Sequence, residues 1–322
     1  LSMLVTSILL GSLSFINYYF DSKLKSKYNV ISKNMGGAIF HLLRVGMMLR
    51  GLNLIFFAFS KMITNVIVKI VIVHYYFKNK EKKLRLEFNS KIASKLLRDS
   101  FPLLLGSIAV IIYMKIDQIM IANMISEGAV GLYSASARLS ELWYFIPGVI
   151  STSTLPLLVK SKKGSKTIYL KQIQAILNQY AVVAYAITIP ILIFAWYFIN
   201  LVYGIEYIAA VPMLRIHILS CIFVFIGMGA SNVILIENYL VFGLITAIVG
   251  AVINIVLNLM LIPLYSGLGA SISTLVSYSF ARVFVNLLYG KTKHIGIMQL
   301  KALIYPISYI ILSAKKILEK DN

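Results

Sequence analysis

The chain has 322 residues, of which 59% are hydrophobic and 13% are charged, and its mean hydropathy is +0.85. Soluble domains carry about 25% charged residues, so this composition excludes an ordinary soluble protein and predicts a polytopic membrane protein. The net charge of +20 does not by itself indicate nucleic-acid binding, because the basic residues are concentrated in particular loops.

Apolar runs of close to 20 residues recur along the whole chain, and each is long enough to cross about 30 Å of hydrocarbon. Because every backbone polar group must be satisfied inside the lipid, these runs are expected to be helices. The predicted spans lie at about 1–20, 36–57, 59–77, 101–124, 131–159, 175–200, 212–236, 241–263 and 268–289. The sequence therefore predicts an all-α polytopic helical membrane protein.

A tenth apolar stretch, at about 297–313, has no single interpretation. As a simple span it would carry Lys315, Lys316 and Lys320 to the outer side, against the preference of basic residues for the cytoplasm. An interfacial helix, a re-entrant segment and a weakly inserted span all remain open.

Basic residues mark one side of the membrane. Lys and Arg number four in 21–33, eight in 78–98, five in 160–173 and two in 291–293, whereas 125–130, 201–211 and 264–267 contain none. This asymmetry predicts that the basic loops are cytoplasmic. Most of the net charge is thus a topology signal that also attracts anionic lipid headgroups.

The longest polar interruption predicts the domain organisation. Residues 79–99 are expected to form a cytoplasmic basic amphipathic linker, with Leu84, Phe88, Ile92 and Leu96 at helical spacing. Residues 1–78 would then form a partial N-terminal transmembrane lobe of about three helices, 100–290 a six-helix C-terminal lobe, and 291–322 a tail. The chain starts inside an apolar run that lacks the pattern of a signal peptide, so we expect the first lobe to be incomplete and the chain to begin partway through a longer protein.

Two predicted spans each carry opposite charges. Lys115 and Asp117 lie in FPLLLGSIAVIIYMKIDQIMIANM, and Arg138 and Glu141 lie in the span that follows. A charge inside a bilayer costs about 2.5 to 3.5 kcal/mol even on the lenient insertion scale. Two interpretations are compatible with each other. The charges form structural ion pairs, such as Arg138 with Glu141 one turn later, and they line a polar cavity.

Depth along the helices groups some of these charges. At 1.5 Å per residue, Asp117, Arg138 and Arg50 are each expected about 10–12 Å from the outer ends of their spans, so with Glu141 they would share a layer. Lys115 and Arg44 would lie nearer the midplane. Within the spans, seven cations exceed the two anions Asp117 and Glu141, so some of the cations are expected to face an anionic ligand. The seven cations are Arg44, Arg50, Lys69, Lys115, Arg138, Arg215 and Arg282.

The sequence offers no pattern of a catalytic or metal site. It has no Walker loop, no zinc-ligand spacing and no large external loop for a catalytic domain. We therefore expect no enzyme activity, no cofactor and no metal, and a glycan polymerase or ligase is disfavoured. Asn254 and Asn258 lie one turn apart in an apolar span and are expected to make interhelical hydrogen bonds.

These segments resemble a known transporter family. The runs KIDQIMIANM and VGLYSASARLSELWYFIPGVISTSTLPLL, and later VYGIEYIAAVPMLRI and NIVLNLMLIPLYSGLGASISTLVSY, are similar to the C-terminal lobe of Wzx-type O-antigen flippases. The early YYFDSKLKSKYNVISKN resembles the cytoplasmic loop after the family's fourth helix. Wzx proteins are polysaccharide transporters of the multidrug/oligosaccharidyl-lipid/polysaccharide exporter (MOP) superfamily.

The resemblance implies a two-lobed protein with a cationic central cavity and alternating access. It implies translocation of an undecaprenyl-pyrophosphate-linked O-antigen repeat unit from the cytoplasmic to the periplasmic leaflet of the bacterial inner membrane. The implied partners are this lipid-linked oligosaccharide and membrane lipids, with the O-antigen polymerase and chain-length regulator as candidates. A lipid II flippase, a drug/cation antiporter of the same superfamily and a non-transporting membrane scaffold remain alternatives.

Candidate site residues follow from the charges and the resemblance together. Arginine binds phosphate groups in bidentate fashion, and Arg138 lies in the motif YSASARL, whose arginine is similarly placed in lipid II flippases. Arg138, Lys115, Arg44 and Arg50 are therefore expected to bind substrate. Asp117 and Glu141 are expected to serve in proton coupling or in ion pairing.

Overall fold

The computed structural model describes residues 11, 13–22, 25, 27–51, 54–79 and 89–318, and these are almost entirely helical, without a strand. The chain divides into two compact units, Leu1–Phe88 (unit 1) and Asn89–Asn322 (unit 2). The predicted all-α class is confirmed for the described residues. Most of the first predicted span, the chain start and the linker residues 80–88 lie outside them.

Unit 1 contains α2 (Phe15–Ser22), α3 (Lys27–Leu49) and α4 (Leu54–Asn79). Helices α3 and α4 pack along each other, and Gly36 leaves room for the side chain of Val68 at their contact. The chain turns at Gly51, whose positive φ of 59° suits a residue without a Cβ. The predicted span 36–57 is therefore wrong at its end: apolar residues continue past the turn, so hydropathy alone could not locate it.

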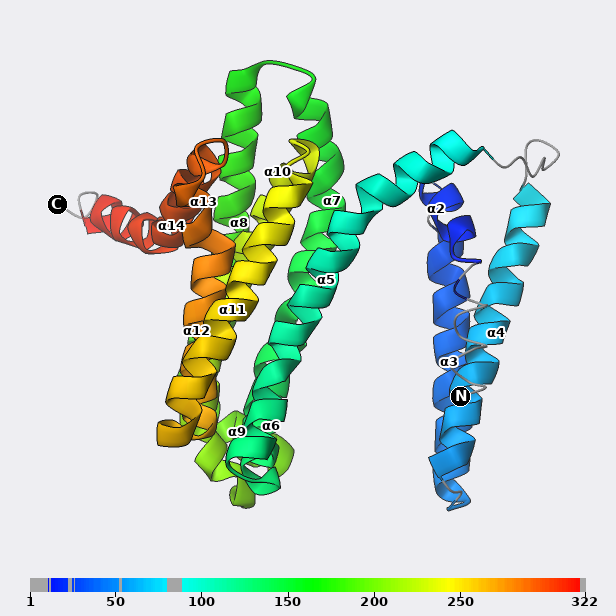
Figure 1. Cartoon of the computed structure of the whole chain (residues 1–322), viewed down its shortest axis with the longest axis horizontal. Helices are drawn as coiled ribbons and strands as arrows, with labels where there is room; N and C mark the ends of the chain where they lie inside the picture. Colours follow the sequence, from blue (N-terminus) through cyan, green and yellow to red (C-terminus); the bar gives the residue numbers. More distant parts are fainter. Residues whose placement is uncertain are drawn as a thin grey trace. The chain divides into compact units, whose positions relative to one another are not determined.

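Unit 2 begins with a long helix and continues as a bundle (Figure 1). Its elements are α5 (Ser90–Met124), α6 (Glu127–Glu141), η1 (Leu142–Tyr144), α7 (Phe145–Lys162), α8 (Lys166–Ile193), α9 (Ala195–Tyr203), η2 (Ile205–Ala210), α10 (Val211–Ile236), α11 (Leu240–Tyr265), α12 (Gly267–Ser279), η3 (Phe280–Phe284), α13 (Val285–Leu288) and α14 (Lys293–Leu318). The short η1 turn precedes Pro147, which has no N–H to bond the carbonyl four residues earlier.

Six helical segments among the described residues are long and apolar enough to cross a membrane, and all six lie in unit 2. They are Ser90–Met124, Glu127–Lys162, Lys166–Ile193, Ile205–Ile236, Leu240–Tyr265 and Gly267–Leu288. They correspond to the six spans predicted between residues 101 and 289. The expected span 175–200 differs most, because α8 starts at Lys166 and ends at Ile193.

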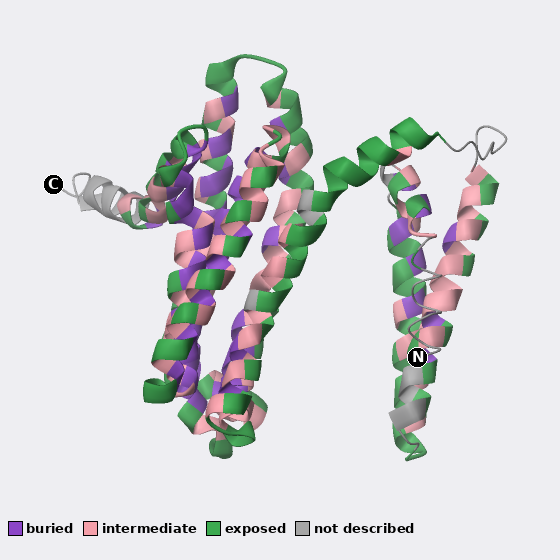
Figure 2. Ribbon diagram, in the orientation of Figure 1, coloured by how far each residue is buried: buried purple, intermediate pink, exposed green. Residues whose placement is uncertain are grey.

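Helix α10 forms the centre of unit 2. About two thirds (67%) of its most apolar stretch is buried inside the protein, against 12% for α5. It packs against α6, α7, α8 and α12, and a helix that is apolar on all sides is expected in such a central position. Figure 2 shows the buried residues on the inward faces, with exposed residues on the outward faces of the surrounding helices.

The loops of unit 2 gather at two ends. The α7–α8 connection, the α10–α11 connection and residues 289–292 lie at one end, together with most of its basic loop residues, and we term this the basic end (Figure 1). The α5–α6 connection, α9, η2 and the α11–α12 turn at Ser266 lie at the opposite end.

Helix α14 contains the tenth apolar stretch and lies steeply inclined to α8 and α12 (Figure 1). It is tied to α8 by Gln174 Nε2, which donates to the Met298 carbonyl at 3.1 Å, and by the Tyr185 hydroxyl, which donates to the Leu303 carbonyl at 3.1 Å. It is not among the six helical segments that meet the length and hydropathy of a membrane span.

Candidate functional site

Helices α5 and α6 bring two of the predicted charges into contact. A two-residue connection forces the helices to run antiparallel side by side, and the Ser126 hydroxyl caps α6 by accepting from the Ala129 N–H at 3.2 Å. Lys115 Nζ then lies 3.2 Å from Glu141 Oε2. Glu141 thus pairs with a cation on the neighbouring helix, and the expected local pair with Arg138 is not formed.

Arg138 lies one turn before Glu141 on the same helix, and its side chain is exposed. Among the described residues it has neither an ion pair nor a hydrogen-bonding partner for its guanidinium. The opposite face of α6 is buried, so Arg138 is directed away from the interior of unit 2. We term Lys115, Arg138 and Glu141 the charged patch; it carries two positive charges and one negative charge.

Asp117 lies two residues beyond Lys115 but is buried, with 1% of its surface exposed. Its Oδ2 accepts from the Tyr133 hydroxyl at 2.6 Å and from the Thr274 hydroxyl at 2.7 Å, and its Oδ1 accepts from Asn258 Nδ2. Asn254 Oδ1 in turn accepts from Asn258 Nδ2 at 3.2 Å. These residues, termed the Asp117 cluster, join α5, α6, α11 and α12.

The Asp117 cluster differs from the expected ion pair. The donors to the carboxylate are neutral hydroxyl and amide groups, and no cation among the described residues lies within salt-bridge distance of it. A carboxyl group removed from water is costly when charged unless its oxygens are hydrogen-bonded. A buried carboxyl group that accepts hydrogen bonds from three other helices can take up a proton, and a change in its protonation would act on all four helices.

The structure revises the expected position of Arg138 along its helix. Helix α6 begins at Glu127, four residues before the expected start, so Arg138 lies about 16 Å from the end of its helix at 1.5 Å per residue. In the contact between α5 and α6, Asp117 meets Tyr133 and Lys115 meets Glu141. That Asp117, Arg138 and Glu141 share one depth in the membrane stays a prediction.

The candidate residues of unit 1 lie on α3 and in the turn after it. The guanidinium of Arg44 lies 5.6 Å from the centre of the Phe40 ring, close enough for a cation–π interaction. Arg50 follows the last residue of α3 and is exposed in the turn, so its expected depth within a helix is wrong. Arg44 and Arg50 belong to unit 1 and the charged patch belongs to unit 2. Their joint role in substrate binding stays a prediction.

Sequence reasoning did not single out two members of the Asp117 cluster, Tyr133 and Thr274. The expectation for Asn258 and Asn254 is confirmed, because Asn258 bonds Asp117 on α5 and Asn254 lies 3.5 Å from the Ser277 hydroxyl on α12. A polar side chain on an otherwise apolar helix face was the available signal.

Comparisons with known proteins bear on the family and on the fold. A family model described as polysaccharide biosynthesis protein matches residues 1–162, half of the chain. No curated protein matches. Three solved structures are similar: a multidrug resistance MATE family transporter of the MOP superfamily in an inward-facing conformation, the lipid II flippase MurJ in an inward closed conformation, and MATE in the bent conformation.

The structural likeness is broad although the sequences have diverged. In the same order, the TM-scores are 0.71, 0.65 and 0.72, and the identities are 13%, 14% and 15%. The similarity covers 89%, 96% and 90% of this chain and 68%, 68% and 66% of those chains. At such identities the likeness shows the fold alone, a helical bundle like that of the MATE and MurJ structures, and the chain spans about two thirds of the length of these structures.

Proposed function

This chain belongs to the polysaccharide biosynthesis protein family, and on that premise we propose that it flips undecaprenyl-pyrophosphate-linked O-antigen repeat units. Translocation would run from the cytoplasmic to the periplasmic leaflet of a bacterial inner membrane. Family and fold point to a multi-pass membrane transporter or flippase and not to a catalytic enzyme.

The observation that carries the proposal is the exposed guanidinium of Arg138 within a membrane-spanning segment. Keeping such a charge in a bilayer costs about 2.5 to 3.5 kcal/mol, and Glu141, one turn away, is already paired with Lys115. A pyrophosphate would offset that cost, because a guanidinium forms two parallel hydrogen bonds with phosphate oxygens. The charged patch therefore suits an anionic headgroup better than a cationic drug.

In this mechanism the diphosphate engages cations while the glycan crosses a polar interior and the lipid tail stays in the bilayer. Arg138 and Lys115 would act from the C-terminal lobe, and Arg44 and Arg50 from the N-terminal lobe. The two lobes would rock to open the cavity to each side in turn. Release on the periplasmic side would pass the repeat unit to the O-antigen polymerase and the chain-length regulator.

The Asp117 cluster provides a candidate coupling element. Protonation of the carboxyl group would convert one acceptor oxygen into a donor, so the bonds from Tyr133 and Thr274 to Oδ2 could not both persist in their present form. A proton at this position would thus shift the packing of α5, α6 and α12. Glu141 is assigned to ion pairing with Lys115 and not to coupling.

Three alternatives make different predictions. A lipid II flippase would bind a similar pyrophosphate lipid but would be essential for cell-wall synthesis. A drug/cation antiporter would confer drug resistance that is insensitive to the charge of Arg138. A non-transporting scaffold would tolerate neutralisation of Arg138 and Lys115 without loss of function.

The test is complementation of a bacterium that makes the cognate repeat unit but lacks its O-antigen flippase. The protein would be expressed from its complete reading frame, as wild type and as Arg138→Gln. The matched control is Arg215→Gln, which removes another exposed arginine from a membrane-spanning helix. The ladder of O-antigen lengths on a lipopolysaccharide gel reports flipping, and immunoblots of membranes report the amount of protein.

We expect the wild type and Arg215→Gln to restore the ladder, and Arg138→Gln to reduce it at least about tenfold. A tenfold reduction corresponds to a loss of about 1.4 kcal/mol. The absence of a ladder from well-expressed wild type would refute the substrate assignment. Drug resistance from the same strain would instead support the antiporter.

A further inference from the structure

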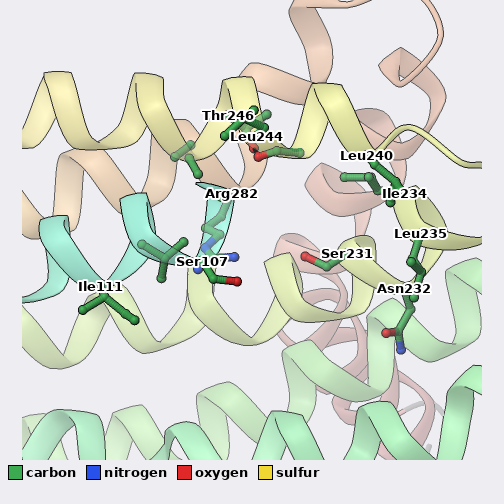
Figure 3. Close-up of a pocket in the computed structure, with 15 residues that line it drawn as sticks. Ser107, Ile111, Ser231, Asn232, Ile234, Leu235, Leu240, Leu244, Thr246 and Arg282 are labelled. Atoms are coloured by element: carbon green, nitrogen blue, oxygen red, sulfur yellow. Dashed lines mark hydrogen bonds between the residues drawn. The ribbon is translucent and has the colours of Figure 1, made fainter. Parts of the chain in front are cut away.

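A cavity of about 510 Å³ lies inside unit 2, between α5, α10, α11 and η3 (Figure 3). This volume is within the range of about 300–1,000 Å³ that is typical of ligand pockets. The described residues that line it are mostly apolar, with four small polar side chains and one charged side chain. They are Gly106, Ser107, Val110, Ile111, Ser231, Asn232, Ile234, Leu235, Leu240, Gly243, Leu244, Thr246, Ala247, Ala281 and Arg282.

The charged residue, Arg282, is positioned by its backbone and its neighbours. It lies in η3, a π-helical turn, and such turns are frequent at functional sites. Gly227 leaves space for its side chain, because a Cβ at Gly227 would lie 2.8 Å from the Arg282 Cβ and Cδ. The carbonyl of Arg282 accepts from Asn286 Nδ2 at 3.2 Å and from Gln299 Nε2 at 2.8 Å.

Polar groups surround the guanidinium side of the cavity. Figure 3 shows the Arg282 side chain extending toward Ser107, with Ser231 and Asn232 along α10. Asn232 is fixed by Ser151, whose hydroxyl donates to Asn232 Oδ1 at 2.8 Å. The Ser231 hydroxyl donates to the Gly227 carbonyl at 2.9 Å, and one Asn232 amide hydrogen faces the Ser151 carbonyl at 3.5 Å. The second amide hydrogen of Asn232 is therefore the group that can donate to an anion that Arg282 attracts.

The cavity lies toward the basic end of unit 2. Its walls include the last turns of α10 and the first turns of α11, which meet at that end. A second, smaller hollow shares Leu240 with it and is lined by Arg98, Asp99 and Tyr239, among others. The cavity is thus adjacent to the surface where a membrane's anionic headgroups would meet the basic loops.

The apolar wall and the single cation indicate an amphipathic anion. Val110, Ile111 and Leu244 offer a surface for hydrocarbon, and burying apolar area is worth about 25 cal/mol per Å². A neutral lipid would bring no negative charge to Arg282, whereas a free phosphate ion would leave the apolar wall uncovered. The described lining contains no carboxylate that would repel an anion.

We propose that this cavity binds one anionic phospholipid, with its phosphate at Arg282 and an acyl chain along α5 and α11. The site is separate from the charged patch and from the Asp117 cluster, and it does not depend on the identity of the transported glycan. Gln299 of α14 bonds the turn that carries Arg282, so an occupied site would also hold α14 against the bundle.

The test uses the purified full chain in a neutral detergent. Native mass spectrometry would measure binding of phosphatidylglycerol, phosphatidylcholine and inorganic phosphate to wild type, to Arg282→Gln and to Arg215→Gln, a matched control that lies outside the cavity lining. In parallel, phosphatidylglycerol with a photoreactive acyl chain would be crosslinked to the wild type and to Leu244→Trp, whose bulkier side chain obstructs the apolar wall of the cavity. The labelled peptides would be located by mass spectrometry.

Phosphatidylglycerol is expected to bind the wild type about tenfold or more tightly than phosphatidylcholine, and Arg282→Gln is expected to remove this preference, since a hydrogen bond to a charged group commonly contributes a factor of about ten or more. Crosslinks are expected within 106–111 and 240–247 and are expected to be lost in Leu244→Trp. Equal binding of the two lipids would overturn the proposal, and so would binding of inorganic phosphate as tight as that of phosphatidylglycerol. Crosslinks confined to other segments would also overturn it. The crosslinking result stands even if Arg282→Gln fails to fold.

Discussion

Removing the hydroxyl group of Tyr133 tests whether the Asp117 cluster is a charge-stabilising network. In Tyr133→Phe the ring and its packing against His217 are kept, while the 2.6 Å bond to Asp117 Oδ2 is lost. Tyr133 is 2% exposed and Asp117 1% exposed, so water cannot readily replace the missing donor. The carboxylate would then rely on Thr274 and Asn258.

The expected loss of stability depends on whether the acceptor of the lost hydrogen bond is charged. Interhelical hydrogen bonds in membrane proteins average about 0.6 kcal/mol and reach about 1.7 kcal/mol, whereas bonds to charged groups are worth about 1.5–3 kcal/mol. For Tyr133→Phe we therefore expect a loss of about 1.5–2 kcal/mol. At about 2–4 °C per kcal/mol for a domain of this size, the unfolding midpoint should fall by about 3–8 °C.

Tyr144→Phe is the matched control, because the Tyr144 hydroxyl lies 3.1 Å from the neutral Ser220 hydroxyl. Its loss should cost about 0.6 kcal/mol and lower the midpoint by about 1–2 °C. The assay is thermal unfolding of the purified protein in one detergent, followed by near-ultraviolet circular dichroism. Equal shifts for the two variants would refute the interpretation that Tyr133 stabilises a buried carboxylate.

Two further predictions concern packing and the charged patch. Gly269→Ala should destabilise the protein by about 1–3 kcal/mol, because its Cβ would collide with the Leu261 carbonyl. The control Gly131→Ala has open space at its Cβ position and should not destabilise it. Similar thermal unfolding midpoints for the two variants would contradict the close α11–α12 contact. Lys115→Gln should lower stability by less than about 1 kcal/mol, because the Lys115 side chain that pairs with Glu141 is half-exposed, yet it should weaken O-antigen flipping. A large loss of stability with an unchanged ladder would assign Lys115 a structural role.

The helical class and the six spans of unit 2 were predictable from the sequence because they depend on local composition. A run of about 20 apolar residues is sufficient to specify a membrane-crossing helix, and no distant contact is needed to recognise it. The end of α3 was not predictable in this way, because the turn at Gly51 depends on its positive φ and apolar residues continue beyond it.

The partners of the charged residues were predictable only in part. The sequence located Lys115, Asp117, Arg138 and Glu141 at unusual positions for charges, and this indicated a functional region. It could not tell which charges meet, because this depends on how each helix is rotated and how deep it lies against its neighbours, which local composition does not set.

The sequence by itself determined that this is a helical membrane protein, where its spans in unit 2 lie, and which ionisable groups they carry. Only the tertiary structure decided that Lys115 pairs with Glu141, that Asp117 is held by neutral donors from three other helices, and that Arg282 lines a cavity. The physical reason is that span formation depends on hydrophobicity summed over neighbouring residues, whereas these contacts depend on helix rotation and depth, which the packing of the whole bundle sets.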